Sequence, residues 1–417
     1  MQSQLLTHIK LLVNTREESH PLYGTDMADL PSLRDAWLLL EGDEIAGYGS
    51  MESLRKDVPV LPEDQVNCEG KIVMPCWCDS HTHLVFAGSR ENEFVDKIRG
   101  LSYAEINARG GGILHTVQKI LETPEDQLFL ESWKRLEEIA KSGTGAVEIK
   151  SGYGLSLEGE LKMLRVIRRL REKSSLSIKS TFLGAHTYPL AFRANHEEYI
   201  RELLEKMLPV IAVEKLADYI DVFCEDGFFS PRESEKILRV GGEYGLKAKM
   251  HVNQLHSIGG IKTGISQNAV SMDHLEIMTS EDLDLIRKSG WKGISTLLPS
   301  AAFFLRMPFP PAKELLQAGA ALALASDYNP GSSPTGNMNL VIALACIQMK
   351  LLPEEAINAA TLNGAFAMDL GKTLGSVTRG KLANLIITTP VPSIAYLPYH
   401  FGSDCIERVM IRGRFIS

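Results

Sequence analysis

The feature that most constrains the fold is an alternation between short apolar runs and longer amphipathic segments, which extends from residue 75 to about residue 370. The amphipathic segments with the clearest helical period are 157–173, 196–208 and 280–289. The eight runs that predict strands are 72–79, 146–150, 180–185, 219–224, 247–251, 269–274, 293–298 and 321–327. This order predicts an α/β fold, a (β/α)8 TIM-like barrel over residues 71–370. A doubly wound open sheet stays the alternative, because periodicity alone does not separate the two.

Both ends of the chain have a different pattern from the middle. Apolar runs at 37–40 and 45–48 flank a Gly-Asp-Glu turn and predict a hairpin, and two more β-type runs lie at 385–388 and 408–414. Residues 1–70 and 371–417 are therefore expected to be rich in strands, and we expect them to lie outside the barrel.

Charge and hydropathy exclude several classes of protein. The chain has 44 Lys and Arg against 52 Asp and Glu, and this mildly acidic balance is not typical of nucleic-acid binding. No run approaches the ~20 apolar residues that span a bilayer, and the first 14 residues do not resemble a signal peptide. Six cysteines in 417 residues are too few for a disulfide scaffold. We expect a cytoplasmic protein with no nucleic-acid and no membrane partner.

Histidines gather where the predicted strands end. Of the 11 histidines, five lie at or just after a strand end, and the eighth predicted strand ends in an aspartate: His81, His83, His186, His251, His274 and Asp327. Any one of these histidines has an ordinary interpretation as a core or loop residue. In a barrel, however, the carboxyl ends of all strands open on one face, where active sites are built. The set as a whole predicts a site.

The pattern of this set suits a metal ion. His81 and His83 are two residues apart, so in a strand both imidazoles point to the same side. Together with a later strand-end histidine and Asp327 they form a nitrogen and oxygen ligand set that suits zinc or iron. Three or four protein ligands leave a position for water, whose pKa the ion lowers towards ~7. The expected chemistry is hydrolysis.

Three further motifs have weaker interpretations. Cys76 and Cys78 flank Trp77 in an apolar strand, and we interpret them as small buried residues. The glycines at 110–112 are not followed by the Lys-Ser or Lys-Thr of a phosphate loop, so we expect a flexible loop over the site. The segment 329–334 directly follows Asp327 at the expected barrel mouth, and we predict that it contacts substrate.

These residues resemble the amidohydrolase superfamily of metal-dependent barrel hydrolases and, within it, the imidazolonepropionase family. The resemblance extends over nearly the whole chain. The segments that carry it are HTHLVFAGSRENEF at 81–94, EIKSGYG at 148–154, residues 181–186, DVFCE at 221–225, HVNQ at 251–254, DYNPGSSP at 327–334 and GKLANL at 380–385.

The resemblance implies a fold, a reaction and a set of site residues. The fold is the barrel plus a small β-sandwich built from both chain termini. The reaction is hydrolysis of 4-imidazolone-5-propanoate to N-formimino-L-glutamate in histidine degradation, with one zinc or iron ion per subunit of an expected homodimer. The implied metal ligands are His81, His83, His251 and Asp327. The implied substrate-binding residues are Arg90, Tyr153, His186, Gln254, Asn329, Gly331 and Ser332.

One departure from the family changes the expected mechanism. Some members have Glu where Gln254 stands, and an amide cannot transfer a proton. Asp327 is then the expected base, which later protonates the leaving nitrogen. His274 is expected to orient the water or stabilise the oxyanion, and His186 to hold the ring. Arg90 offers two parallel donors to the propanoate.

Three alternative functions fit the sequence less well than this interpretation. Binuclear cyclic amidases use a carboxylated lysine on the fourth strand, and the run 219–225 has no lysine. A related deaminase would need a Glu at the position of Gln254. A metal-binding scaffold without catalysis would not explain why Arg90, Tyr153 and Asn329 accompany the ligands.

Overall fold

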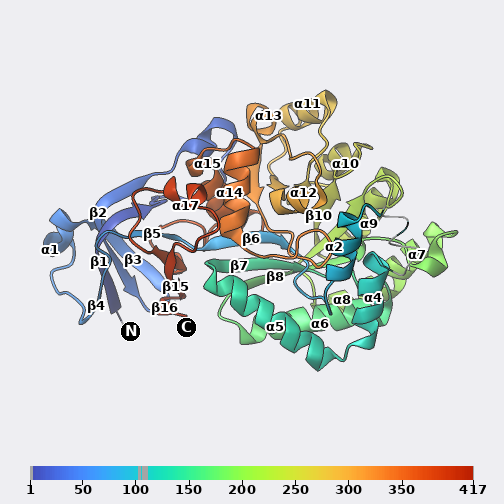
Figure 1. The fold of residues 1–417 in the computed structure, drawn as a ribbon, viewed down its shortest axis with the longest axis horizontal. Helices are drawn as coiled ribbons and strands as arrows, with labels where there is room; N and C mark the ends of the chain where they lie inside the picture. Colours follow the sequence, from blue (N-terminus) through green and yellow to red (C-terminus); the bar gives the residue numbers. More distant parts are fainter. Residues whose placement is uncertain (1–2, 102–104, 106–110, 417) are drawn as a thin grey trace.

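The computed structural model describes residues 3–101, 105 and 111–416, and it places two β-structures next to each other (Figure 1). One is a sheet of eight parallel strands with helices around it, and the other is a mixed eight-stranded sheet. Of the glycines at 110–112, Gly110 lies outside the described residues. Within the described ranges, no helix has the length and apolar character needed to cross a membrane.

The parallel sheet follows chain order without a crossover. Its strands are β6 (Trp77–Thr82), β7 (Thr144–Lys150), β8 (Ser177–Ala185), β9 (Tyr219–Cys224), β10 (Lys247–Val252), β11 (Ser271–His274), β12 (Ile294–Leu297) and β13 (Ala321–Leu324). Each pairs in parallel with the next. Every predicted barrel strand after the first overlaps one of these strands, and 219–224 matches β9 residue for residue.

The first and last strands meet and nearly close the sheet into a barrel. The Asp327 N–H donates to the His81 carbonyl at 3.0 Å, and the His83 N–H donates to the Tyr328 carbonyl at 2.9 Å. Thr82 and Tyr328 form a parallel bridge between the two ends. This seam excludes the open doubly wound sheet and confirms the barrel.

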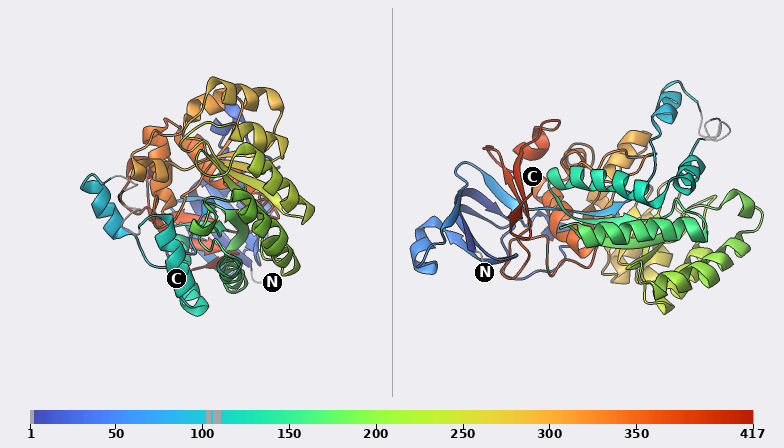
Figure 2. Two further views of the ribbon diagram at one scale, coloured as in Figure 1. Left: turned by 90° about the vertical axis from the view of Figure 1, so that its right-hand side faces the viewer. Right: turned by 90° about the horizontal axis from the view of Figure 1, so that it is seen from below.

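Helices cover the outside of the barrel (Figure 2). They are α2 (Glu91–Ile98), α4 (Ile113–Glu122), α5 (Glu125–Lys141), α6 (Leu157–Lys173), α7 (His196–Glu202), α8 (Leu208–Val213), α9 (Pro231–Glu243), α10 (Gly260–Ser266), α11 (Ser280–Ser289), α12 (Pro299–Leu305), α13 (Ala312–Gln317), α14 (Met338–Gln348) and α15 (Pro353–Asn358). The predicted helices 157–173 and 280–289 are confirmed. The predicted helix 196–208 instead passes through a π-helical turn at Leu203–Met207 and ends at Val213.

The helices that match the prediction best have N-cap side chains that hydrogen-bond to their first turn. Ser156 accepts the Gly159 N–H at the start of α6. Thr279 and Asp282 form a reciprocal capping box at the start of α11. Gly290, the C-cap residue that follows this helix, has a φ of 69°. A cap satisfies backbone donors that have no partner within the helix, and a left-handed glycine stops the next turn. These local signals can be read directly from the sequence.

The second sheet uses strands from both chain ends, which lie close together in space (Figure 1). Its strands are β1 (Ser3–Val13), β2 (Ser32–Glu41), β3 (Glu44–Ser50), β4 (Asp64–Asn67), β5 (Ile72–Pro75), β14 (Leu385–Thr388), β15 (Ile406–Ile411) and β16 (Arg414–Phe415). The predicted hairpin is the antiparallel pair β2 and β3. The unit is one hydrogen-bonded mixed sheet, with β5 beside β1 and β14.

The predicted strand 72–79 is wrong in one respect, because it divides between the two sheets. Residues 72–75 form β5 of the terminal sheet, and the barrel begins at Trp77. The Cys76 N–H donates to the Asn384 carbonyl, whereas the Trp77 N–H donates to the Gly143 carbonyl. One extended run therefore serves two sheets, and Cys76 marks the change of partner.

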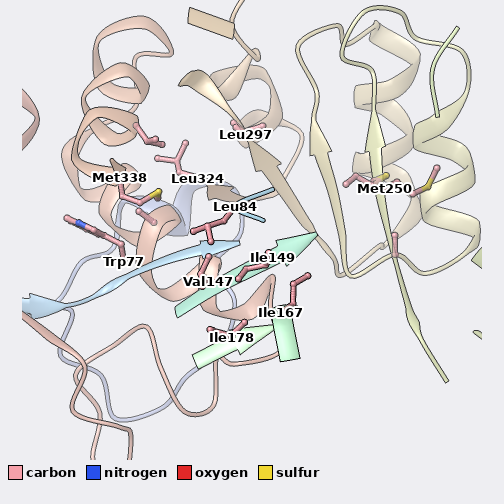
Figure 3. Packing of buried hydrophobic residues seen from close by; sticks show 14 of the residues in the cluster. Trp77, Leu84, Val147, Ile149, Ile167, Ile178, Met250, Leu297, Leu324 and Met338 are labelled. Carbon is pink, nitrogen blue, oxygen red and sulfur yellow. The ribbon is translucent and has the colours of Figure 1, made fainter. Parts of the chain in front are cut away.

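Apolar side chains of the barrel strands pack outwards against the helices. Val147 and Ile149 of β7 belong to the same buried cluster as Ile167 of α6 and Met250 of β10 (Figure 3). Successive residues in a strand face opposite sides, so the residues between these apolar side chains face the barrel axis. This alternation directs polar side chains inwards along β7 and β10.

Asn363 joins the N-terminal segment to the barrel and provides a test of this arrangement. Its side-chain amide donates to the carbonyls of Leu22 and Leu322 at 2.9 and 3.0 Å and accepts the Leu22 N–H at 3.0 Å. Asn363→Ala leaves these buried groups unpaired, so we expect the free energy of the first urea-unfolding transition to fall by about 1–3 kcal/mol. Asn92→Ala, at an exposed position of α2, should change it by less than about 0.5 kcal/mol. Equal values for the two variants would contradict this role.

Candidate metal centre

Four side chains from three parts of the barrel lie close together. The ligand atoms of His81, His83 and Asp327 converge, whereas those of His251 converge with His81 and His274 and with His83 and His186. His81 and His83 lie at the end of β6, and Thr82 between them turns away to the Glu148 carbonyl. His251 is the last residue but one of β10, and its Nε2 is 3.4 Å from the Nε2 of His83. Asp327 follows β13, with its Oδ1 3.6 Å from the His81 Nε2 and 3.7 Å from the His83 Nε2. All four residues are buried.

These distances fit a single metal ion. Tetrahedral zinc with Zn–N distances of 2.0–2.1 Å places neighbouring ligand atoms roughly 3.3–3.4 Å apart. His81, His83 and Asp327 form one group of converging ligand atoms. The buried Nε2 of His81 has no hydrogen-bond partner among the described residues, although such an atom is costly to leave unpaired. A metal ion would use this lone pair.

The three histidines are in the protonation state that a metal needs. Burial lowers the pKa values of His81, His83 and His251 well below their usual value, and neighbouring cationic groups lower them further. A neutral imidazole has a free lone pair, whereas a protonated one does not. All three side chains are therefore ready to bind a cation at neutral pH.

His274 lies beside the centre but differs in charge preference. Its ring centroid is 5.3 Å from that of His251 and 5.6 Å from that of His81. Burial alone would lower its pKa, but the Glu276 carboxylate, 3.4 Å from its Nδ1, and Asp327 outweigh burial and raise it. The backbone φ of His274 is 85°, an unusual conformation that turns the side chain at the strand end. The pKa of His274 is thus shifted in the opposite direction from those of His81, His83 and His251.

His186 and Tyr153 form a wall on the other side of His83. The His186 ring stacks on the His83 ring at 5.1 Å, and the Tyr153 ring centroid is 5.4 Å from that of His186. The His186 Nδ1 donates to the Gly152 carbonyl at 3.1 Å, and burial lowers the pKa of His186 to about 4. Gly152 has a φ of 103°, and an added Cβ would lie 3.0 Å from the His186 Nδ1. Only glycine permits this contact.

Arg90 lies near the loop that follows Asp327. Its Nη2 is 2.6 Å from the Glu93 carboxylate, and both side chains are mostly buried. Its Nε is buried without a hydrogen-bond partner among the described residues. An added Cβ at Gly331 would lie 2.2 Å from the Arg90 Nη1, so a larger residue there would displace the guanidinium. One side of the guanidinium is thus held by Glu93, and the Nε side is not paired.

The loop 329–334 supports Asp327 as well as forming the mouth of the site. The side-chain Oδ1 of Asn329 accepts the N–H groups of Gly331 and Ser332, both at 2.8 Å. Its amide donates to the Asp327 carbonyl at 2.6 Å, and the Ser332 hydroxyl donates to the Asp327 Oδ2 at 3.2 Å. The residues predicted to contact substrate therefore also orient the carboxylate.

Gln254 lies on the loop after β10, three residues beyond His251. Its side chain is half-buried and makes no hydrogen bond to another described residue. The Glu225 carboxylate accepts the N–H groups of Leu255 and His256 and so holds this loop. Of the predicted site residues, Gln254 has the weakest contact with the rest.

Sequence reasoning missed three carboxylates next to the histidines. The His81 Nδ1 donates to Asp273 at 2.6 Å, the His251 Nδ1 donates to Asp221 at 3.0 Å, and Glu276 faces His274. Such partners fix which ring nitrogen faces the metal. The available signal was the presence of charged residues inside strands predicted to be buried. No lysine lies on β9 within the described residues, in agreement with the run 219–225.

Comparisons with known proteins identify the family and the fold. The model of the Amidohydrolase family matches residues 72–416. The imidazolonepropionase of Flavobacterium johnsoniae is 54% identical over 99% of each chain, and that of Christiangramia forsetii is 51% identical over the same shares. Among solved structures, guanine deaminase of E. coli superposes with a TM-score of 0.74 at 14% identity, covering 100% of this chain and 99% of that one. Zinc-bound atrazine chlorohydrolase of Arthrobacter aurescens has a TM-score of 0.69 at 14% identity, covering 99% and 94%. These two similarities concern the fold.

The pKa of Asp327 predicts how metal affinity depends on pH. Burial raises this pKa to about 6, even though His274, Asn329 and Ser332 favour the charged form. A protonated carboxylate competes with the metal, so zinc affinity should be nearly constant from pH 7 to 8 and should fall below pH 6, approaching tenfold per unit. Competition with a chromophoric chelator measures this. The Asp327→Asn variant should bind zinc more weakly, and its zinc affinity should not begin to fall near pH 6. If the zinc affinity of this variant still falls near pH 6, another group is responsible for the pH dependence.

Proposed function

The chain belongs to the amidohydrolase family, and from this premise we propose that it is an imidazolonepropionase. It hydrolyses a ring carbon–nitrogen bond of 4-imidazolone-5-propanoate and yields N-formimino-L-glutamate. The observation that carries the proposal is the 54% identity to an imidazolonepropionase over 99% of both chains. The convergence of His81, His83 and Asp327 supports it.

His81, His83, His251 and Asp327 would hold one ion. Zinc and iron both suit three imidazoles and a carboxylate. When bound, the ion supplies Lewis acidity, which lowers the pKa of a coordinated water towards ~7. The remaining chemistry belongs to the side chains of this chain.

Asp327 is the proposed base. A ring amide is a poor electrophile, so the water must lose a proton as it attacks the carbonyl carbon. The raised pKa of Asp327 suits it to accept that proton and to pass it to the leaving ring nitrogen. Water is thus added across the C–N bond, with OH on carbon and H on nitrogen. Ser332 orients the carboxylate through its Oδ2. Gln254 can hydrogen-bond the ring but cannot carry the proton.

His274 and His186 have separate proposed roles. His274, with a raised pKa, can donate a hydrogen bond to the carbonyl oxygen as negative charge develops there. His186 keeps its Nδ1 on the Gly152 carbonyl, which leaves Nε2 and the ring face for the substrate. Tyr153 adds a hydroxyl beside it. With Arg90, Gln254, Asn329, Gly331 and Ser332, these residues form the proposed substrate pocket.

The proposal includes a cytoplasmic location and a homodimer. The six cysteines are free thiols, a state that a reducing cytoplasm maintains. A homodimer is expected from the family resemblance, and light scattering of the purified protein tests it.

Purified protein and its Asp327→Asn variant provide the direct test. The wild type should convert 4-imidazolone-5-propanoate to N-formimino-L-glutamate and contain one zinc or iron per active chain by elemental analysis. Asp327→Asn should remain folded, with kcat reduced at least ~10²-fold, because proton transfer is lost. Absence of turnover by the metal-loaded wild type would refute the function. Two tightly bound metals per chain would refute the mononuclear site.

Arg90 is the proposed reader of the propanoate carboxylate. Arg90→Met should lower kcat/KM by an amount that corresponds to a loss of roughly 2–5 kcal/mol of transition-state stabilisation, because a buried charge loses its partner. The metal content should stay unchanged. An imidazolone without the carboxylate should be a similarly poor substrate for the wild type, and the two losses should not add.

The Glu93 contact requires a control for this experiment, because Arg90→Met leaves that carboxylate unpaired. Arg90→Met/Glu93→Gln removes the unpaired charge. If the loss comes from missing substrate contact, the double variant stays as slow as Arg90→Met. Recovery of kcat/KM in the double variant would assign the effect to Glu93 and refute carboxylate recognition by Arg90.

A further inference from the structure

The barrel interior beneath the metal centre contains a cluster of charged side chains that the mechanism does not use. Its members are Glu148, Lys150, Asp221, Lys249 and Asp273, and the side chain of each is 0% exposed. Burying isolated charges is costly, so such groups persist only when they are paired and hydrogen-bonded. We define these five residues as the interior ion cluster. Their positions in the barrel suggest a purpose beyond packing.

Lys150 is the centre of the interior ion cluster. Its ammonium is 2.7 Å from Glu148, 2.7 Å from Asp221 and 3.4 Å from Asp273. Burial alone would lower the pKa of Lys150, but these three carboxylates outweigh burial and raise it. Lys150 is therefore a permanent cation between two aspartates from different strands, β9 and β11.

The same two aspartates also hold two of the proposed metal ligands. Asp273 accepts the Nδ1–H of His81 through Oδ2, the oxygen that faces Lys150. Asp221 accepts the Nδ1–H and the backbone N–H of His251 through Oδ1, and its Oδ2 accepts from Lys150. With the proton on Nδ1, the Nε2 atom of each ring is free to face the ion.

We propose that Lys150 is a positioning residue for the metal centre, because it holds the two carboxylates that orient His81 and His251. One buried cation thereby fixes the tautomer and direction of two ligands before the metal arrives. Without it, Asp221 and Asp273 repel each other and lose their shared partner. The inference rests on the proposed metal centre.

Lys249 provides a matched comparison within the same cluster. It is equally buried, but its ammonium bonds to Glu148 and lies 3.5 Å from the Ser80 carbonyl. Glu148 also accepts from Lys150 and from the Thr181 hydroxyl, and among the described residues it has no hydrogen bond to a histidine. Among the described residues, Lys249 therefore makes no hydrogen bond to Asp221 or Asp273, and it acts on these two carboxylates only through its charge, which favours their ionised forms.

The test is the rate of zinc loss to excess EDTA from zinc-loaded wild type, Lys150→Met and Lys249→Met. Removing one carboxylate that supports a ligand usually weakens metal binding 10–100-fold. Because Lys150 supports two, we expect zinc loss at least tenfold faster in Lys150→Met, and less than about threefold faster in Lys249→Met. The visible spectrum of the cobalt-substituted protein should change in Lys150→Met alone. Equal rates in the two lysine variants, or a wild-type rate in Lys150→Met, would overturn the proposal.

Two further measurements apply if Lys150→Met does not fold. Glu148→Gln/Lys150→Met removes one charge of each sign, so it keeps the net charge of the cluster and should still lose zinc at least tenfold faster. A wild-type rate in this double variant would overturn the proposal. In metal-free wild type, nitrogen NMR of labelled histidine should show His81 and His251 as Nδ1–H tautomers, and Nε2–H tautomers would overturn it as well. If wild type itself binds no zinc or iron, the proposed metal centre fails, which is distinct from failure of the role of Lys150.

Discussion

The site depends on the contact between the first and last strands of the barrel. Two backbone hydrogen bonds join residues that are about 246 positions apart in the chain, His81 to Asp327 and His83 to Tyr328. This seam brings the histidine pair of β6 beside the carboxylate after β13. A sheet with the same strands but no seam would leave Asp327 at the opposite edge from its partners. Barrel closure therefore builds the ligand set, and the intervening strands add His251 and His274.

The chain has an unusual backbone at several residues of the site. His274, Leu275 and Asp327 have φ values of 85°, 66° and 54°, which side-chain-bearing residues rarely adopt. Such conformations persist only where the surrounding structure holds them, and they occur often at functional sites. Asn329 and Ser332 hold Asp327, and Glu276 holds His274. The same contacts orient the groups that we propose to move protons.

The barrel interior is charged where most protein cores are apolar. Lys150 and Lys249 balance most of the charge of three buried carboxylates, and two of these, Asp221 and Asp273, in turn support two histidines. Replacing a buried ion pair by apolar side chains is often neutral for stability. The interior ion cluster is therefore better explained by the orientation of ligands than by stability.

The order of strands and helices, the strand-end position of the histidines and the family resemblance were all available in the sequence, because hydrophobic period, helix caps and motif spacing are local. The helix 157–173 and the strand 219–224 were predicted to the residue for this reason.

The sequence could not show that the run 72–79 divides at Cys76, since both halves are extended and apolar and only their partners differ. The alternation of Glu148 and Lys150 with Val147 and Ile149 along β7 is visible in the sequence, but it does not show which partners the charged side chains have. The pairing of Arg90 with Glu93, three residues later, is a local contact that the sequence already offered. The bridge from Lys150 to Asp221 and Asp273 was decided by tertiary structure alone. Side-chain contacts such as these depend on rotamers and on which strands the closed barrel makes neighbours, and neither is encoded in a local pattern.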